Sequence, residues 1–126
     1  MYVADAHAFA SYLMDTLPSK ADKIFKDGEA EECKILVPSI ALAELIYVFE
    51  KTDKKSKIWD MFDRLDVNPS IKVQPLDEEV LKLVPDVKLK ELHDRIIVAT
   101  CILVKAKQLI TKDEEIVNAK IVSTMW

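Results

Sequence analysis

The chain has 126 residues, of which 50% are hydrophobic and 32% are charged, and its formal net charge is −4. This length supports one hydrophobic core, and the ordinary apolar content excludes an intrinsically disordered protein. One Gly and five Pro exclude a collagen-like or flexible-linker sequence. No apolar run approaches the roughly 18 residues that a membrane span needs, so we expect no membrane association.

The N-terminal sequence, the cysteines and the pI indicate which cellular compartment and which kinds of ligand to expect. The start of the chain, Met1 to Asp5, has no basic segment followed by an apolar one, so we expect no secretory signal. Cys33 and Cys101 are too few for a disulfide scaffold, and no Cys/His pair has zinc-site spacing. We therefore expect reduced thiols in a cytoplasmic protein. The pI of about 5.2 argues against coating of nucleic acid by bulk charge, so a nucleic-acid ligand would need a local basic rim or a bound cation.

Hydrophobic patterning predicts short strands that alternate with longer helices. The predicted strands are residues 2–4, 34–37, 71–73, 109–111 and 121–123. The predicted helices are residues 6–13, 18–28, 38–51, 53–66, 76–84, 92–107 and 114–118. Short apolar strands separated by helices indicate a parallel sheet that is covered on both faces. We predict one α/β domain over residues 1–126, a three-layer α/β/α sandwich with a central parallel sheet.

Several local signals set the expected helix boundaries. Gly28, the only glycine, is expected to end the second helix, and Ser39 and Asp77 are expected to start the third and fifth helices. The apolar residues of the helix at 53–66 are expected to pack in the core. They are Ile58, Trp59, Phe62 and Leu65.

Glu44 is the only carboxylate in the apolar run from Ile40 to Phe49. None of its helical neighbours three or four residues away is a cation, so no local ion pair offsets its burial. A desolvated, unpaired carboxylate costs several kcal/mol. A distant Lys or Arg, a bound proton or a metal ion must therefore compensate for it.

Three further acids lie at the ends of predicted elements. Asp94 lies near the start of an apolar helix, where the helix dipole alone would favour an acid. Asp5 directly follows a predicted strand and Asp113 lies two residues after another, where each can act as a helix N-cap. In a parallel sheet, however, residues just past the carboxyl ends of the strands line one edge, where ligands bind. We expect Asp5, Glu44, Asp94 and Asp113 to converge at this edge.

Convergence of like charges is unfavourable unless a cation lies among them. Oxygen ligands without His or Cys indicate Mg²⁺ or Mn²⁺ rather than zinc. Such a site suits phosphodiester hydrolysis, because one ion lowers the pKa of a bound water and a second, roughly 3.5–4 Å away, stabilises the leaving oxygen. Arg95 and Lys112 each adjoin a proposed ligand and are candidates for phosphate contacts.

Four blocks of sequence, in this order, resemble the PIN-domain family, and most closely the VapC-like toxin ribonucleases of prokaryotic toxin–antitoxin pairs. The blocks are Val3–His7, Pro38–Leu45, His93–Thr100 and Leu109–Asp113. The resemblance spans nearly the whole chain, and it is the order and spacing of the blocks that make it specific.

The resemblance implies that Asp5, Glu44, Asp94 and Asp113 are both the catalytic residues and the metal ligands, and that Thr111 supports the site. It implies a parallel-sheet α/β/α fold and an Mg²⁺- or Mn²⁺-dependent endoribonuclease that cleaves RNA with a metal-activated water. It also implies a homodimer and, for a toxin of the VapBC type, a cognate antitoxin.

The sequence departs from the family pattern after the first aspartate, where the family usually has Thr or Ser and then Asn. Here Ala6 and His7 stand in these places, which removes a hydroxyl and an amide from the expected site. Two alternatives therefore stay open: a non-toxin RNA-processing nuclease, and a catalytically weak scaffold that binds RNA or a protein partner.

Overall fold

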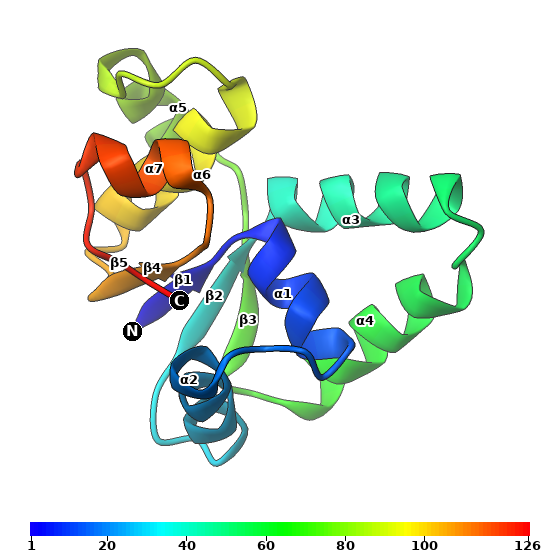
Figure 1. Cartoon of the computed structure of the whole chain (residues 1–126). Helices are drawn as coiled ribbons and strands as arrows, with labels where there is room; N and C mark the ends of the chain where they lie inside the picture. The colour runs from blue at the N-terminus through cyan, green and yellow to red at the C-terminus, as the bar shows by residue number, and fades with distance from the viewer.

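The computed structural model describes residues 1–126 and contains one five-stranded sheet (Figure 1). Its strands are β1 (Tyr2–Ala4), β2 (Ile35–Pro38), β3 (Ile71–Gln74), β4 (Gln108–Ile110) and β5 (Thr124–Met125). The strand order is β3-β2-β1-β4-β5, and every neighbouring pair is parallel. The predicted α/β class with a central parallel sheet is confirmed.

Helices cover both faces of this sheet. They are α1 (Ala6–Leu13), α2 (Ser19–Glu29), α3 (Ser39–Lys51), α4 (Ser56–Val67), α5 (Glu78–Leu83), α6 (Leu92–Leu103) and α7 (Glu114–Ala119), with a 3₁₀ turn at Val84–Asp86. Figure 1 shows α5, α6 and α7 grouped on one side of the sheet and α1, α2 and α4 on the other. None of the helices is both long and apolar enough to cross a bilayer.

Alternation along the strands divides the core into two clusters. Ala4 and Val37 belong to the cluster under α1 to α4, whereas Val3 and Leu36 belong to the cluster under α5 to α7. Because successive strand residues point to opposite faces and both faces are covered, the strands read as continuous apolar runs in the sequence. The three-layer arrangement follows from this two-sided burial.

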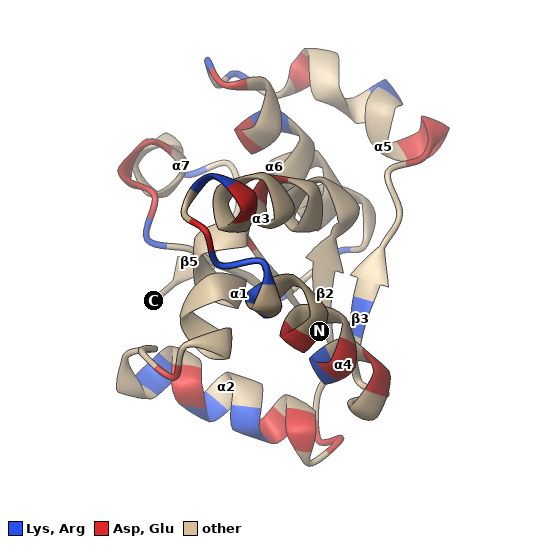
Figure 2. Cartoon of the chain, turned by 90° about the vertical axis from the view of Figure 1, so that its right-hand side faces the viewer, with Lys and Arg blue, Asp and Glu red and all other residues tan.

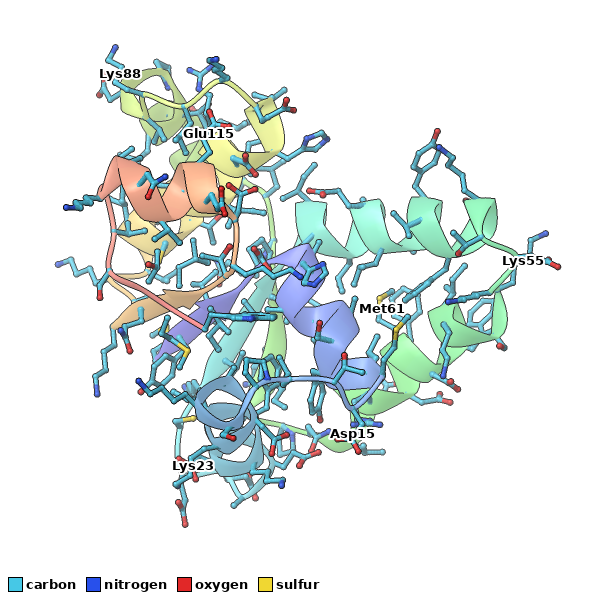
Figure 3. All side chains as sticks on the ribbon, in the orientation of Figure 1. Asp15, Lys23, Lys55, Met61, Lys88 and Glu115 are labelled. Carbon is cyan, nitrogen blue, oxygen red and sulfur yellow. The ribbon has the colours of Figure 1, made fainter.

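The predicted core role is wrong for two residues of α4, since Trp59 is 68% exposed and Phe62 is 37% exposed. Met61 is fully buried, and Figure 3 shows it between α4 and α1. Ile58 and Leu65, three and four residues from Met61, share its face and pack against the core. The buried stripe therefore runs through Met61 rather than Phe62, which leaves Trp59 on the opposite side of the helix.

Gly28 does not end α2, contrary to the prediction, because the helix continues to Glu29. A Cβ at Gly28 would lie 2.9 Å from Cδ1 of Ile35 and 3.4 Å from Cγ1 of Ile71. The glycine is thus explained by the close approach of α2 to β2 and β3 rather than by a helix end. Figure 2 shows that the outer surface of α2 carries interspersed acidic and basic residues, as expected for a solvated helix.

The two predicted helix starts have different outcomes. Asp77 caps α5, because its Oδ1 accepts a hydrogen bond from the N–H of Val80 at 3.1 Å. Ser39 does not cap α3, which begins directly after Pro38 without a side-chain cap. The Ser39 hydroxyl instead accepts a hydrogen bond from the N–H of Leu76 at 3.1 Å, and so ties the start of α3 to the segment after β3.

Two boundaries near the C-terminus also differ from the prediction. Helix α6 ends at Leu103 rather than at residue 107, because Lys105 adopts a left-handed conformation with φ of 54°. The N–H of Lys105 donates to the carbonyl of Ile102 and the N–H of Ala106 donates to that of Cys101, which is a Schellman end. Strand β5 lies at Thr124–Met125, not at 121–123, because it follows a turn after α7.

The left-handed conformation of Lys105 yields a stability prediction. Lys105→Gly is expected to raise the free energy of unfolding by about 1 kcal/mol, because glycine adopts this conformation without the steric cost of a Cβ. Thermal unfolding followed by circular dichroism measures the change. Lys107→Gly is the matched control, since the φ of Lys107 is negative and glycine should not stabilise it. An unchanged or lower unfolding temperature for Lys105→Gly would contradict the prediction.

Candidate metal centre

The carboxyl ends of β1 and β4 border a pocket of about 220 Å³. The chain passes from β1 outward to β2 and β3 and then returns to β4 on the other side of β1, so the pocket lies where the strand order reverses. The pocket is lined by Asp5, Ala6, His7, Glu44, Asp94, Ile97, Lys112 and Asp113. The structure thus brings all four predicted carboxylates to one pocket.

Thr111 connects two of these acids. Its hydroxyl donates to Oδ2 of Asp5 and accepts a hydrogen bond from the N–H of Asp113 at 3.0 Å. Oδ1 of Asp5 accepts from the N–H of Ala8 at 2.8 Å, and Oδ1 of Asp113 accepts from the N–H of Ile116 at 3.1 Å. Both aspartates are therefore helix N-caps, the simpler interpretation that the sequence allowed. Because each cap uses only one carboxylate oxygen, capping does not exclude a second role.

Glu44 is half-buried on α3 and forms no ion pair with a Lys or Arg. Its Oε1 is buried and has no hydrogen-bond partner. Burial raises the pKa of this carboxyl, and the charge of Asp5 raises it further, while His93 opposes both effects. Of the three compensations that the sequence allowed, a distant Lys or Arg is absent, which leaves a bound proton or a metal ion.

Asp94 lies in the first turn of α6, and its pKa is raised to about 6. Burial is the largest cause, followed by the charges of Asp113, Glu115 and Glu44. Burial also raises the pKa of Asp5, although its hydrogen bonds to Thr111 and Ala8 oppose the shift. Burial is the largest cause of all three pKa shifts, and the charge of another pocket carboxylate adds to each of them.

The two candidate phosphate contacts lie in different places. Lys112 is exposed and lines the carboxylate pocket. The Arg95 side chain instead donates from Nη2 to the carbonyl of Val84 at 2.9 Å and lines a neighbouring pocket with Lys88 and Glu115, which Figure 3 labels. Lys112 therefore lines the carboxylate pocket, whereas Arg95 holds the 3₁₀ turn against α6.

The donor set fits a hard divalent cation in its chemistry, because all four side chains supply carboxylate oxygens. With the side chains as they stand, no three of them lie close enough together to hold one ion. Burial and neighbouring charges, not hydrogen bonds, account for the pKa shifts of Glu44 and Asp94. No hydrogen bond holds the carboxylate of Glu44 or Asp94, whereas the carboxylates of Asp5 and Asp113 are held by their caps.

Two aromatic residues at the rim complete the description. His7, which stands where the family pattern has an amide, is exposed and lines the pocket, and its charge lowers the pKa of Asp5. Trp126 lies beside it, with the two ring centroids 5.8 Å apart. Trp126 was not among the predicted site residues, because the last strand was expected earlier in the chain and no motif includes this residue.

The raised pKa of Asp94 predicts how stability changes with pH. Between the usual value of 3.8 and about 6, the folded protein binds more protons than the unfolded chain, so stability falls as pH rises through this window. Asp94→Asn removes the charge and is expected to stabilise the protein in a chelator above about pH 6, by on the order of 1 kcal/mol after solvent screening.

Well below pH 3.8, where the carboxyl is protonated in both states, the same substitution should give no gain. Unfolding temperatures across this pH range test the prediction, with Asp66→Asn on the exposed side of α4 as the control. Destabilisation by Asp94→Asn at neutral pH would show that Asp94 makes a favourable structural interaction instead.

Several solved structures resemble the chain over nearly its full length. VapBC2 from Rickettsia felis, solved with a DNA fragment from its promoter, has a TM-score of 0.76 at 16% identity and covers 98% of this chain and 96% of its own. FitAcB from Neisseria gonorrhoeae has a TM-score of 0.74 at 18% identity, with 100% and 97% covered. VapC20 from Mycobacterium tuberculosis, described as a toxin that cleaves the sarcin–ricin loop, has a TM-score of 0.72 at 8% identity, with 97% of each chain covered.

At these identities the structural matches establish the fold. No curated protein matches the sequence. The family model for the PIN domain, however, matches residues 2–122. Since that match covers almost the whole sequence and includes every residue of the carboxylate pocket, the chain belongs to the PIN domain family.

Proposed function

We propose that the protein is an Mg²⁺- or Mn²⁺-dependent endoribonuclease, acting as the toxin of a VapBC-type toxin–antitoxin pair. The observation that carries the proposal is the buried, unpartnered Oε1 of Glu44 in a pocket with three further carboxylates. A pocket of this kind is costly in water and becomes favourable when it holds a divalent cation.

In this proposal Asp5, Glu44, Asp94 and Asp113 hold the metal. The hydroxyl of Thr111 fixes the orientation of Asp5 and, through the N–H of Asp113, the start of α7. When bound, Mg²⁺ or Mn²⁺ supplies a lower pKa for a water nucleophile and neutralises charge on the phosphate. Lys112, at the rim, is placed to attract the phosphate backbone.

RNA is the proposed substrate because of the family and of one structural neighbour. VapC20, which shares the fold, is described as a toxin that cleaves the sarcin–ricin loop. An acidic protein with a net charge of −4 can hold a polyanion when a bound cation offsets its carboxylates. The unpaired thiols of Cys33 and Cys101 fit a reducing compartment such as the cytoplasm.

The proposed partners are a cognate antitoxin and a second copy of the chain. A toxin–antitoxin complex from Klebsiella pneumoniae has the same fold, with a TM-score of 0.68 at 16% identity. On this chain, Trp59 and Phe62 of α4 and Tyr47 of α3 are large side chains with more than a third of their surface exposed. Exposed aromatic residues of this kind are typical of protein interfaces.

The alternatives are a non-toxin processing nuclease and a scaffold that binds RNA without cutting it. Ala6 and His7 favour the scaffold, because both line the pocket and neither supplies the hydroxyl or amide of the family pattern. Intact RNA bound to the metal-loaded wild type would support the scaffold. Cleavage of RNA without toxicity in cells would support the processing enzyme.

Removal of the Glu44 charge tests the nuclease. Glu44→Gln is expected to lower Mn²⁺-dependent cleavage of single-stranded RNA by on the order of a hundredfold or more, because even outer partners of metal ligands contribute 10- to 100-fold. Glu50→Gln is the matched control, since it removes the same charge from an exposed position of α3. Equal cleavage by the wild type and Glu44→Gln would point to a contaminating nuclease or another site.

Metal binding is testable without catalysis. Mn²⁺ at about 100 times its dissociation constant should stabilise the wild type by roughly 2.7 kcal/mol, which raises the unfolding temperature by several degrees. The rise should be clearly smaller for Glu44→Gln and unchanged for Glu50→Gln. If Mn²⁺ stabilised Glu44→Gln as much as the wild type, Glu44 would not be a ligand.

A further inference from the structure

A second cavity, of about 610 Å³, adjoins the carboxylate pocket. It lies between the segment after β4, helix α7 and strand β5, and Figure 1 shows these elements together beside the C-terminus. Its lining residues are Thr111, Lys112, Glu114, Val117, Asn118, Thr124, Met125 and Trp126. The cavity therefore combines one aromatic ring, apolar side chains and several polar groups.

Lys112 joins the two cavities, because its side chain lines both. A strand whose phosphate lies at the carboxylate pocket would pass Lys112 and place its next residue in the larger cavity. The volume of this cavity lies within the range of small-molecule sites in proteins, which is roughly 300–1,000 Å³. Size and position thus suit one unit of a polymer that extends from the reacting phosphate.

Trp126 gives the larger cavity its chemical character. The centroids of its ring and of the His7 ring are 5.8 Å apart, and the two rings are tilted by 51°. Nζ of Lys112 lies 5.9 Å from the centroid of the Trp126 ring. His7 and Lys112 both line the carboxylate pocket. The indole is thus held at the boundary between the two cavities by an aromatic and a cationic neighbour, and packing against the core supports it from below.

The polar side chains that line the cavity indicate whether a nucleobase or a phosphate would bind in it. Glu114 lines the cavity and would repel an anion there, whereas its carboxylate and the amide of Asn118 can accept or donate hydrogen bonds to the edge of a base. Stacking on an aromatic side chain suits any nucleobase, because every base has a π-face. The aromatic ring, Glu114 and Asn118 therefore favour a nucleobase in this cavity, while Lys112 at its boundary favours the adjoining phosphate.

We propose that the Trp126 cavity binds an unpaired nucleobase of the RNA strand next to the scissile phosphate, with Lys112 bridging to the backbone. This inference rests on the proposed ribonuclease function. It assigns Trp126 a role in substrate binding, and it requires that the bound segment is single-stranded, because a base in a duplex cannot enter the cavity.

Tryptophan fluorescence tests the inference without cleavage. The chain has two Trp residues, so Trp59→Phe leaves Trp126 as the only reporter. With Glu44 retained and Ca²⁺ added in place of Mg²⁺ to suppress cleavage, a short single-stranded RNA of mixed sequence should quench the Trp126 emission to saturation. Anisotropy of a fluorescein on the same RNA measures binding independently. Trp126→Phe is the matched control, because Trp59 is then the reporter and its emission should not change.

Trp126→Ala should weaken RNA binding about fivefold or more, as expected for the loss of one stacked base, and Trp126→Phe should retain most of the affinity. Absence of saturable Trp126 quenching overturns the inference, whether or not anisotropy reports binding. Equal quenching by a blunt duplex of the same sequence also overturns it. The nuclease proposal is judged separately by cleavage with the wild type, so RNA cleavage without Trp126 quenching would reject this cavity alone.

Discussion

The charge of Glu44 is the constraint on which the site depends. Its Oε1 is buried without a partner, and the pKa of the carboxyl is raised by burial and by Asp5. In a stable fold such a group is usually paired or absent, because unpaired burial costs several kcal/mol. The charge of Asp5 increases this cost, so the pocket lowers the free energy of unfolding unless the charge of Glu44 is compensated. Such local conflict between stability and structure is typical of functional sites.

The topology explains why the acids meet. Asp5 and Asp113 follow β1 and β4, which are neighbours in the sheet although more than a hundred residues separate the two acids. Glu44 and Asp94 reach the same pocket from α3 and α6, two helices that contact each other over it. The strand order reverses between β1 and β4, and the pocket that these side chains line lies at this point of the sheet edge.

Much of this arrangement could be predicted from the sequence, because it depends on patterns that are local. The alternation of apolar strands and helices predicted the α/β class. The positions of Asp5 and Asp113 after two strands predicted that both lie at the carboxyl edge of the sheet. What could not be predicted depends on contacts between distant elements. The close approach of α2 to β2 explains Gly28, and the carbonyl of Val84 explains where Arg95 points. Neither contact produces a periodic pattern in the sequence. The exposure of Trp59 was not predicted, because the buried face of α4 contains Met61 rather than Phe62.

Helix dipoles offset part of the crowding, but unequally. Asp5 and Asp113 cap α1 and α7, and Asp94 lies in the first turn of α6, so the positive ends of three helices face the pocket. This effect falls off within the first turn of a helix. Glu44 is the sixth residue of α3 and lies beyond it. Of the four carboxylates it alone has neither a helix terminus nor a hydrogen bond for its buried oxygen, so the compensation that the other three obtain from the fold must reach Glu44 from a bound proton or, in the proposed function, from a metal ion.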